Sequence, residues 1–185
     1  MSTITMTVTG HRPTKLGGYS LPSYKKLNDF SKVMIGMYQK EFLPIKLNVN
    51  VGMALGWDMA VARACLSLRV PYTAYIPFEG QERLWSAGYQ NEYRDLLKGA
   101  KKVINTDPGG QLNTPNERLR VVRKMLLRNQ RMVDDCSLVL ALWDGTPSGT
   151  RNCVNYANSL KIDVHNRWDM WVEFNRVYKE IKGEI

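Results

Sequence analysis

The segment SLVLALW at residues 137–143 runs directly into DGTPSGTRN at residues 144–152. An uncharged run of this length, followed by a turn rich in small residues, is typical of a strand that is buried on both faces. Such strands occur mainly in parallel sheets that are covered by helices on each side. The segment therefore predicts an α/β fold in which a glycine-containing turn leads from a buried strand into a helix.

The rest of the chain alternates short β-rich segments with longer helical ones. Besides residues 137–143, the expected strands are Thr3 to Thr9, Lys46 to Val51, Tyr72 to Ile76, Lys102 to Asn105 and Ile162 to His165. The expected helices are a segment that opens at Ser23 and closes before Pro44, Trp57 to Leu68, Glu82 to Lys98, Asn116 to Asp134, Thr150 to Leu160 and Trp168 to Ile181. This alternation predicts a mainly parallel sheet with helices on both faces, in a single domain over residues 1–185.

The chain of 185 residues has an excess of positive charge. It contains 26 basic and 17 acidic side chains, so the formal net charge is +9. This balance favours anionic partners such as nucleotides, nucleic acid or phosphorylated metabolites, although solubility alone would also explain it. With 44% hydrophobic residues, the composition excludes a collagen, a disulfide scaffold and a wholly disordered chain.

The sequence carries no pattern typical of a membrane span, a signal peptide or a metal site. The longest strongly apolar stretch, Leu138 to Trp143, is far shorter than the roughly 20 residues that span a bilayer. The first residues, MSTITMTVTG, do not resemble a signal peptide. The cysteines Cys65, Cys136 and Cys153 lack the spacing of a zinc site. We therefore expect a cytoplasmic protein with no membrane partner, no bound metal and no cofactor.

The loop after the first expected strand offers cations to a ligand. In a parallel sheet, ligands bind outside the carboxyl ends of the strands, so the loops at these ends identify a candidate site. Gly10 allows an abrupt exit from the strand, and Arg12 and Lys15 are suited to bind a phosphate. The alternative is an exposed turn with incidental charges. His11 is a candidate proton carrier or a hydrogen-bonding side chain.

The next loops add glycines and carboxylates. In VGMALGWD, Gly52 and Gly56 would let the backbone approach a ligand closely. Asp58 would repel a phosphate, so sugar hydroxyls are its better target, or it stabilises the first turn of a helix. Glu82 is a candidate to bind ribose or to act as an acid–base group. The turn-rich loop from Thr106 to Pro115 is a further candidate.

The loop after the buried strand is the most informative. Its backbone N–H groups and hydroxyls would surround a phosphate. The acidic Asp144 lies at its start and the basic Arg151 at its end. The candidate residues are Asp144, Gly145, Ser148, Gly149, Thr150 and Arg151. The alternative is a tight strand-to-helix turn with Thr150 near the N-cap.

The expected helix at residues 116–134 is strongly basic. Its cations are Arg118, Arg120, Arg123, Lys124, Arg128 and Arg131. Such a helix would line a nucleic-acid groove or form a solvated basic face. No aromatic residue is interleaved with these cations, so the helix does not offer stacking to single strands.

Five motifs occur in the same order as in a known superfamily. They are GHRP at residues 10–13, GMALGWD at 52–58, PFEGQERLW at 77–85, RNQRMVD at 128–134 and WDGTPSGTRNCVNYA at 143–157. Over residues 3–165 the chain resembles the SLOG superfamily, in particular its YspA/YpsA-like branch. The resemblance implies a Rossmann-like domain that binds a nucleotide or a nucleotide-derived ligand. It also implies a homo-oligomer, because relatives in this superfamily often form one.

Two relatives in this superfamily suggest different chemistry. The turn at residues 148–150 resembles the phosphate-binding region of the Lonely Guy phosphoribohydrolases, whose motif continues Gly-Thr-x-x-Glu with a catalytic glutamate. In this chain Cys153 takes that position, and a thiol does not stabilise an oxocarbenium-like centre as a carboxylate does. Glu82, with Asp58 second, is the expected substitute. The DNA-processing protein A family is the other relative.

Three functions are consistent with these residues. The first is a sensor or ligand-sequestering protein, including a phage-encoded one, in which residues 145–151 hold a phosphate with help from Arg12, Lys15 or Arg128. The second is a nucleotide N-glycosidase or deoxyribosyltransferase that uses one of the two carboxylates named above. The third is a nucleic-acid-binding module. In each case the aromatic residues of segment 168–181 would pack on the sheet or on another subunit.

Overall fold

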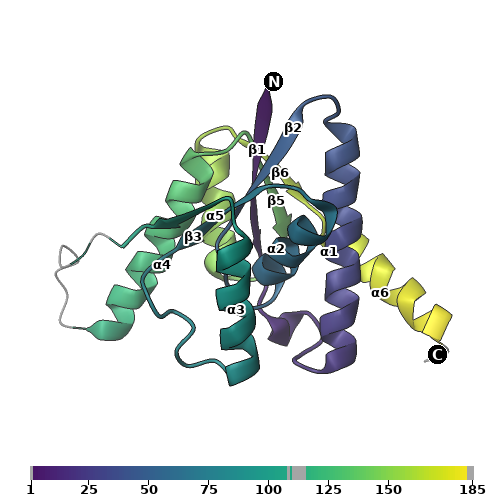
Figure 1. Cartoon of the computed structure of the whole chain (residues 1–185), viewed down its shortest axis with the longest axis horizontal. Helices are drawn as coiled ribbons and strands as arrows, with labels where there is room; N and C mark the ends of the chain where they lie inside the picture. The colour runs from purple at the N-terminus through teal and green to yellow at the C-terminus, as the bar shows by residue number, and fades with distance from the viewer. Residues whose placement is uncertain (1, 108, 110–115, 183–185) are drawn as a thin grey trace.

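The computed structural model describes residues 2–107, 109 and 116–182, and its centre is a six-stranded sheet (Figure 1). The strands are β1 (Thr3–Gly10), β2 (Lys46–Val51), β3 (Tyr72–Ile76), β4 (Lys102–Asn105), β5 (Leu138–Leu142) and β6 (Asp163–Asn166). Every neighbouring pair is parallel, and the strand order is β4-β3-β2-β1-β5-β6. The order reverses between β1 and β5, and this switch point is where an open parallel sheet offers a crevice to a ligand.

Helices cover both faces of the sheet. They are the 3-10 helix η1 (Pro13–Lys15) and the α-helices α1 (Leu21–Glu41), α2 (Trp57–Leu68), α3 (Ala87–Gly99), α4 (Glu117–Asp134), α5 (Gly149–Ser159) and α6 (Trp168–Lys182). Helix α1 packs on α2 and α6, whereas α4 packs on α5. Figure 1 shows α4 and α5 on the opposite side of the sheet from α1, α2 and α6. The predicted fold class, a parallel sheet with helices on both faces, is confirmed.

The central strands are buried because apolar residues occupy both of their faces. All five residues of β5 are buried, as predicted for a strand that is covered on each side. In the neighbouring β1, Met6 and Val8 belong to the main core, together with Phe30 of α1 and Trp57 of α2. Removal of this apolar surface from water is the dominant favourable contribution to folding.

Most element boundaries follow the sequence pattern, and the largest difference lies before α3. The strands β2, β3 and β4 and the helix α2 have the predicted limits. The predicted helix from Glu82 begins only at Ala87. Residues 80–85 form turns instead, one of which is closed by a hydrogen bond from the Arg83 N–H to the Gly80 carbonyl oxygen. The backbone is still extended at Ser86, the N-cap of α3, with a φ of −63° and a ψ of 154°, so the helix cannot include the residues before it.

Two other helices begin slightly earlier than predicted. Helix α1 begins at Leu21 rather than at Ser23, because the Ser20 side chain caps it. Helix α5 begins at Gly149 rather than at Thr150. The cap that precedes α5 contributes to the site described below.

Helix α6 packs its aromatic side chains on the core of its own chain. Trp171 is 3% exposed, and its ring centroid lies 5.2 Å from that of Phe30 in α1. The Phe174 ring lies at the same distance from Phe30. The interpretation of this segment as part of the core is therefore correct. Within the described ranges, no helix has both the length and the apolar character that crossing a membrane requires.

Candidate functional site

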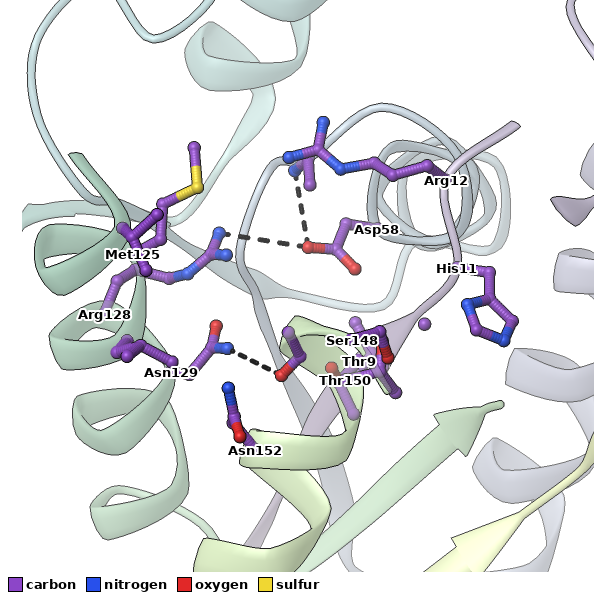
Figure 2. Close-up of a pocket in the computed structure, with 16 residues that line it drawn as sticks. Thr9, His11, Arg12, Asp58, Met125, Arg128, Asn129, Ser148, Thr150 and Asn152 are labelled. Carbon is purple, nitrogen blue, oxygen red and sulfur yellow. Dashed lines mark hydrogen bonds and ion pairs between the residues drawn. The ribbon is translucent and has the colours of Figure 1, made fainter. Parts of the chain in front are cut away.

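A cavity of about 290 Å³ lies at the carboxyl end of β1, beside the switch point of the sheet (Figure 2). Four segments line it: residues 8–12 at the end of β1, residues 54 and 58 at the start of α2, one side of α4 between residues 122 and 129, and residues 148–150 and 152 at the start of α5. This volume is close to the lower limit of about 300 Å³ that is usual for small-molecule sites. The cavity is therefore the size of a site for one small ligand.

Asp58 and Arg128 form a buried, incomplete ion pair in this cavity. Each is 6% exposed, and Arg128 Nη1 lies 4.0 Å from Asp58 Oδ2 (Figure 2). The Ala54 N–H donates a hydrogen bond to the same carboxylate oxygen at 3.3 Å, and Arg128 Nη1 donates to the Gly52 carbonyl oxygen. Burial raises the pKa of Asp58, which Arg128 partly offsets, and burial lowers the pKa of Arg128. Among the groups that the structure describes, Arg128 Nε has no hydrogen-bond partner, so this buried guanidinium retains a free donor.

The start of α5 and Arg12 supply further positive potential. Ser148 is the N-cap of α5, and its hydroxyl accepts a hydrogen bond from the Arg151 N–H at 3.3 Å. Gly149 and Thr150 follow in the first turn, where the free N–H groups of a helix attract anions. The side chain of Arg12 is exposed and lines the same cavity. Figure 2 shows Arg12 and Ser148 on two different loops, with Asp58 between them in this view.

Three predicted glycines shape the site by making room for protein groups. A Cβ atom at Gly10 would lie 2.5 Å from Trp57 Cδ1, and one at Gly52 would overlap the Arg128 guanidinium. Gly56 has a φ of +98°, and a Cβ atom added there would lie 2.5 Å from the carbonyl oxygen of His11. We expected Gly52 and Gly56 to admit a ligand. They instead admit side chains and backbone of this chain, because the loops around the cavity pack directly on each other.

Asp144 and Lys15 bind each other outside the lining of the cavity. The Asp144 carboxylate accepts a hydrogen bond from Lys15 Nζ at 2.8 Å and from the Thr146 N–H at 3.0 Å, and it lies 2.7 Å from His11 Nε2. Burial alone would raise the pKa of Asp144, but the hydrogen bonds from Lys15, Thr146 and His11 lower it below its ordinary value. Figure 2 shows the His11 ring directed away from Asp58. These residues therefore join two loops. Neither Lys15 nor Asp144 is among the residues that line the cavity, and their role as ligand contacts stays a prediction.

Glu82, the first candidate for chemistry, and Cys153 also lie outside the lining of the cavity. Glu82 is 8% exposed, and its nearest cationic partner is Arg94, at 3.6 Å. It does not line the cavity, because the turns before α3 hold it elsewhere. Cys153 is 1% exposed within a small apolar cluster, and burial raises the pKa of its thiol to about 12. Its thiolate is therefore scarce near neutral pH, and it is not a nucleophile there.

Two more predicted residues remain apart from the cavity, and most of one predicted loop lies outside the described residues. Gly145 and Arg151 are not among its lining residues. Gly145 instead makes the turn after β5, with a φ of +86°. Of the loop at residues 106–115, residues 108 and 110–115 lie outside the described part of the chain.

Several lining residues were not identified from the sequence. The most important are Thr9, Ala54, Met125, Asn129 and Asn152. A signal for the α4 residues exists, because Val122, Met125, Leu126 and Asn129 recur at the spacing of one helical face. That spacing indicates a shared face, but it does not indicate that the face borders a cavity.

Solved structures of other proteins have the same fold. DNA processing protein A from Streptococcus pneumoniae matches 88% of this chain and 49% of its own chain, with a TM-score of 0.56 and 19% identity. The protein TM1055 matches 87% of this chain and 72% of its own, with a TM-score of 0.54 and 15% identity. DNA processing protein A from Helicobacter pylori, described with a single-stranded DNA binding mode, matches 97% and 82%, with a TM-score of 0.54 and 11% identity. This chain thus spans about half the length of the Streptococcus protein.

The fold and the cavity at its switch point define a Rossmann-like domain, as the resemblance to the SLOG superfamily implied. No family model matches the chain. Over 140 residues the chain is 33% identical to an uncharacterized SPbeta prophage-derived protein, YoqJ, of Bacillus subtilis strain 168. The matched region covers 70% of this chain and 80% of YoqJ. The chain belongs to the family of YoqJ.

Proposed function

We propose that the protein binds a nucleotide or a nucleotide-derived small molecule in the cavity, as a cytoplasmic sensor or ligand-sequestering protein. The observation that carries the proposal is Arg128, a buried guanidinium at the cavity with one donor left without a protein partner in the described structure. A buried unsatisfied donor is costly, and an anionic ligand that enters the cavity would satisfy it. The prophage origin of YoqJ extends the proposal to a phage-encoded sequestering protein.

The charges around the cavity support one orientation of such a ligand. The phosphate would lie at the first turn of α5, where Ser148, Gly149 and Thr150 line the cavity and the helix dipole favours an anion. Arg12 would contact the phosphate oxygens from the adjacent loop. Asp58 would repel the phosphate, and its carboxylate is suited to accept hydrogen bonds from sugar hydroxyls instead.

Calorimetric titration tests this proposal. Ribose 5-phosphate, AMP, GMP, CMP and UMP are titrated into the wild-type protein and into Arg12→Gln. We expect at least one of them to bind, and the variant to bind it at least about tenfold more weakly, because a charged hydrogen-bonding group is lost. The matched control is Arg118→Gln, which removes the same charge from an exposed position on α4 outside the lining. The proposal is wrong if none of these compounds binds, or if both variants weaken binding equally.

Cleavage of the bound nucleotide is the second candidate function. Asp58 favours it, because this is the only carboxylate among the described residues that line the cavity. An ionised Asp58 would stabilise positive charge at C1′ while the bond to the base breaks; a water oxygen would then bond to C1′, and the base would take up a proton. Free base in the titration mixtures after long incubation would support cleavage. Intact nucleotide at saturating protein would leave binding as the function.

A further inference from the structure

A second hollow, the α4/α5 groove, lies next to the cavity. Its volume is about 380 Å³, and three residues, Leu126, Asn129 and Asn152, line both spaces. Beyond these shared residues the groove is lined by Gln130, Cys153, Asn155 and Tyr156. The two spaces therefore share one border, which is formed by side chains of α4 and α5.

The groove has a different chemical character from the cavity. No charged side chain is among its described lining residues, whereas four of the seven are amides: Asn129, Gln130, Asn152 and Asn155. The Asn129 amide donates a hydrogen bond to the Gly149 carbonyl oxygen at 3.3 Å. Across the described residues, the side chains of the other three amides make no hydrogen bond to protein. Figure 2 shows the amides of Asn129 and Asn152 facing the same space from α4 and α5.

This surface suits a neutral group with hydrogen-bond donors and acceptors on its edge. An amide side chain both donates and accepts, and paired amide contacts are a common way for proteins to recognise a nucleobase. Leu126 and Tyr156 add apolar surface for the face of a flat ring. The charged groups of Arg12, Arg128 and Asp58 all lie in the cavity rather than in the groove.

The distance along α5 between the cavity and the groove also fits the length of a mononucleotide. Along α5, residues 149 and 155 are six residues apart, which corresponds to about 9 Å at the rise of an α-helix. That reach is comparable with the separation of the phosphate and the base in a mononucleotide. We infer that the α4/α5 groove holds the base of a nucleoside phosphate whose phosphate lies at the start of α5. This inference rests on the proposed function, and it adds that the protein selects its ligand by the base.

Replacement of the groove amides tests the inference. The double variant Gln130→Ala/Asn155→Ala removes two exposed amides that line the groove but not the cavity, and it introduces residues that favour a helix, so we expect it to fold. Affinities for ribose 5-phosphate, AMP, GMP, CMP and UMP are measured by calorimetry. In the wild type we expect one nucleotide to bind at least about tenfold more tightly than ribose 5-phosphate. In the variant this advantage should fall to about threefold or less, with the affinity for ribose 5-phosphate unchanged.

A control variant shows whether an effect belongs to the groove. Asn158→Ala lies on α5 but outside the lining of the groove, and it should leave every affinity unchanged. If nucleotides and ribose 5-phosphate bind equally well to the wild type, or if the double variant keeps the full preference for one base, the inference about the groove is wrong while the proposed function stands. If neither ribose 5-phosphate nor any nucleotide binds, the proposed function fails, and the inference fails with it.

Discussion

Two carboxylates of this protein respond to their surroundings in opposite ways. Burial raises the pKa of Asp58, and its partners are one backbone N–H and the Arg128 guanidinium at 4.0 Å. Burial acts in the same direction on Asp144, but hydrogen bonds from Lys15, Thr146 and His11 outweigh it. Asp58 is the more deeply buried of the two and has the fewer donors, and both differences act in the direction of the two shifts. Asp58 keeps hydrogen-bonding capacity for a ligand, whereas Asp144 uses its capacity within the protein.

The stability contributed by Asp144 should depend on pH. Its folded-state pKa lies below the ordinary value of 3.8, so its contribution is fully present above that value and is lost as the pH falls below it. At pH 7 we expect Asp144→Asn to lower the free energy of unfolding by about 1–3 kcal/mol. The loss should become smaller as the pH falls from about 4. Urea unfolding of wild type and variant across this pH range measures both effects.

A matched substitution separates this effect from the loss of a surface charge. Asp163→Asn removes an exposed carboxylate from β6, for which no side-chain partner exists within the described structure. We expect it to change the free energy of unfolding little at any pH. A loss at Asp144→Asn that is the same at pH 7 and at pH 3 would contradict the assignment, because it would not depend on the ionised carboxylate.

Among the helices, α5 has a first turn that is stabilised by a cap and that also borders the cavity. Ser148 caps the helix and also lines the cavity. The start of α4 offers a comparison, since the Asn116 side chain caps that helix by accepting a hydrogen bond from the Leu119 N–H at 3.1 Å. Asn116 does not line the cavity. The two caps therefore stabilise their helices in the same way. They differ in position, because Ser148 lines the cavity and Asn116 does not.

Substitution of these two caps separates the roles. We expect Ser148→Ala and Asn116→Ala each to lower the free energy of unfolding by about 1 kcal/mol, measured by urea unfolding. Ser148→Ala alone should weaken the binding of a nucleotide or of ribose 5-phosphate, by about three- to tenfold, because a hydroxyl beside the phosphate is lost. Equal effects of both variants on affinity would show that the start of α5 is not the phosphate site.

Across the molecule, much of the positive charge lies on α4, and its six cations have different surroundings. Of the six cations on α4, Arg128 is buried at the cavity and Lys124 pairs with Asp107 at 2.7 Å. The remaining four, Arg118, Arg120, Arg123 and Arg131, are exposed. The basic helix is therefore partly a solvated face, as one of its two sequence interpretations predicts. The exposed arginines do not line the cavity, so nucleic-acid binding by α4 can be tested separately from binding in the cavity.

Salt dependence tests that alternative. Binding of a single-stranded oligonucleotide along the exposed arginines would give a log–log slope of affinity against salt of about −2 to −3, because each neutralised phosphate contributes about −0.7. Replacing Arg118, Arg120 and Arg123 by Gln should reduce the magnitude of this slope by about 2, as followed by fluorescence anisotropy. Binding of a mononucleotide should not change. A shallow slope that is the same in the variant would exclude nucleic acid as a partner of this helix.

Local sequence patterns predict most of the elements of the fold. The limits of β2, β3, β4 and α2 follow from hydrophobic patterns and turn residues that lie within a few positions of each other, and the resemblance to the SLOG superfamily implied the Rossmann-like fold that the structure has. The sequence also placed Arg12, Asp58 and Arg128 among the candidates that the structure brings to one cavity. Each of these conclusions depends on local spacing or on short motifs.

Which of the candidates face the cavity depends on how the elements pack in three dimensions. The tertiary structure turned Lys15 and Asp144 toward each other, placed Glu82 in a turn outside the lining, and brought Asn129 and Asn152 together from two helices. The physical reason is that these distances depend on the order of the strands and on the side of each helix that packs inward. Neither quantity is a property of residues that are neighbours in the chain, so no local pattern specifies it.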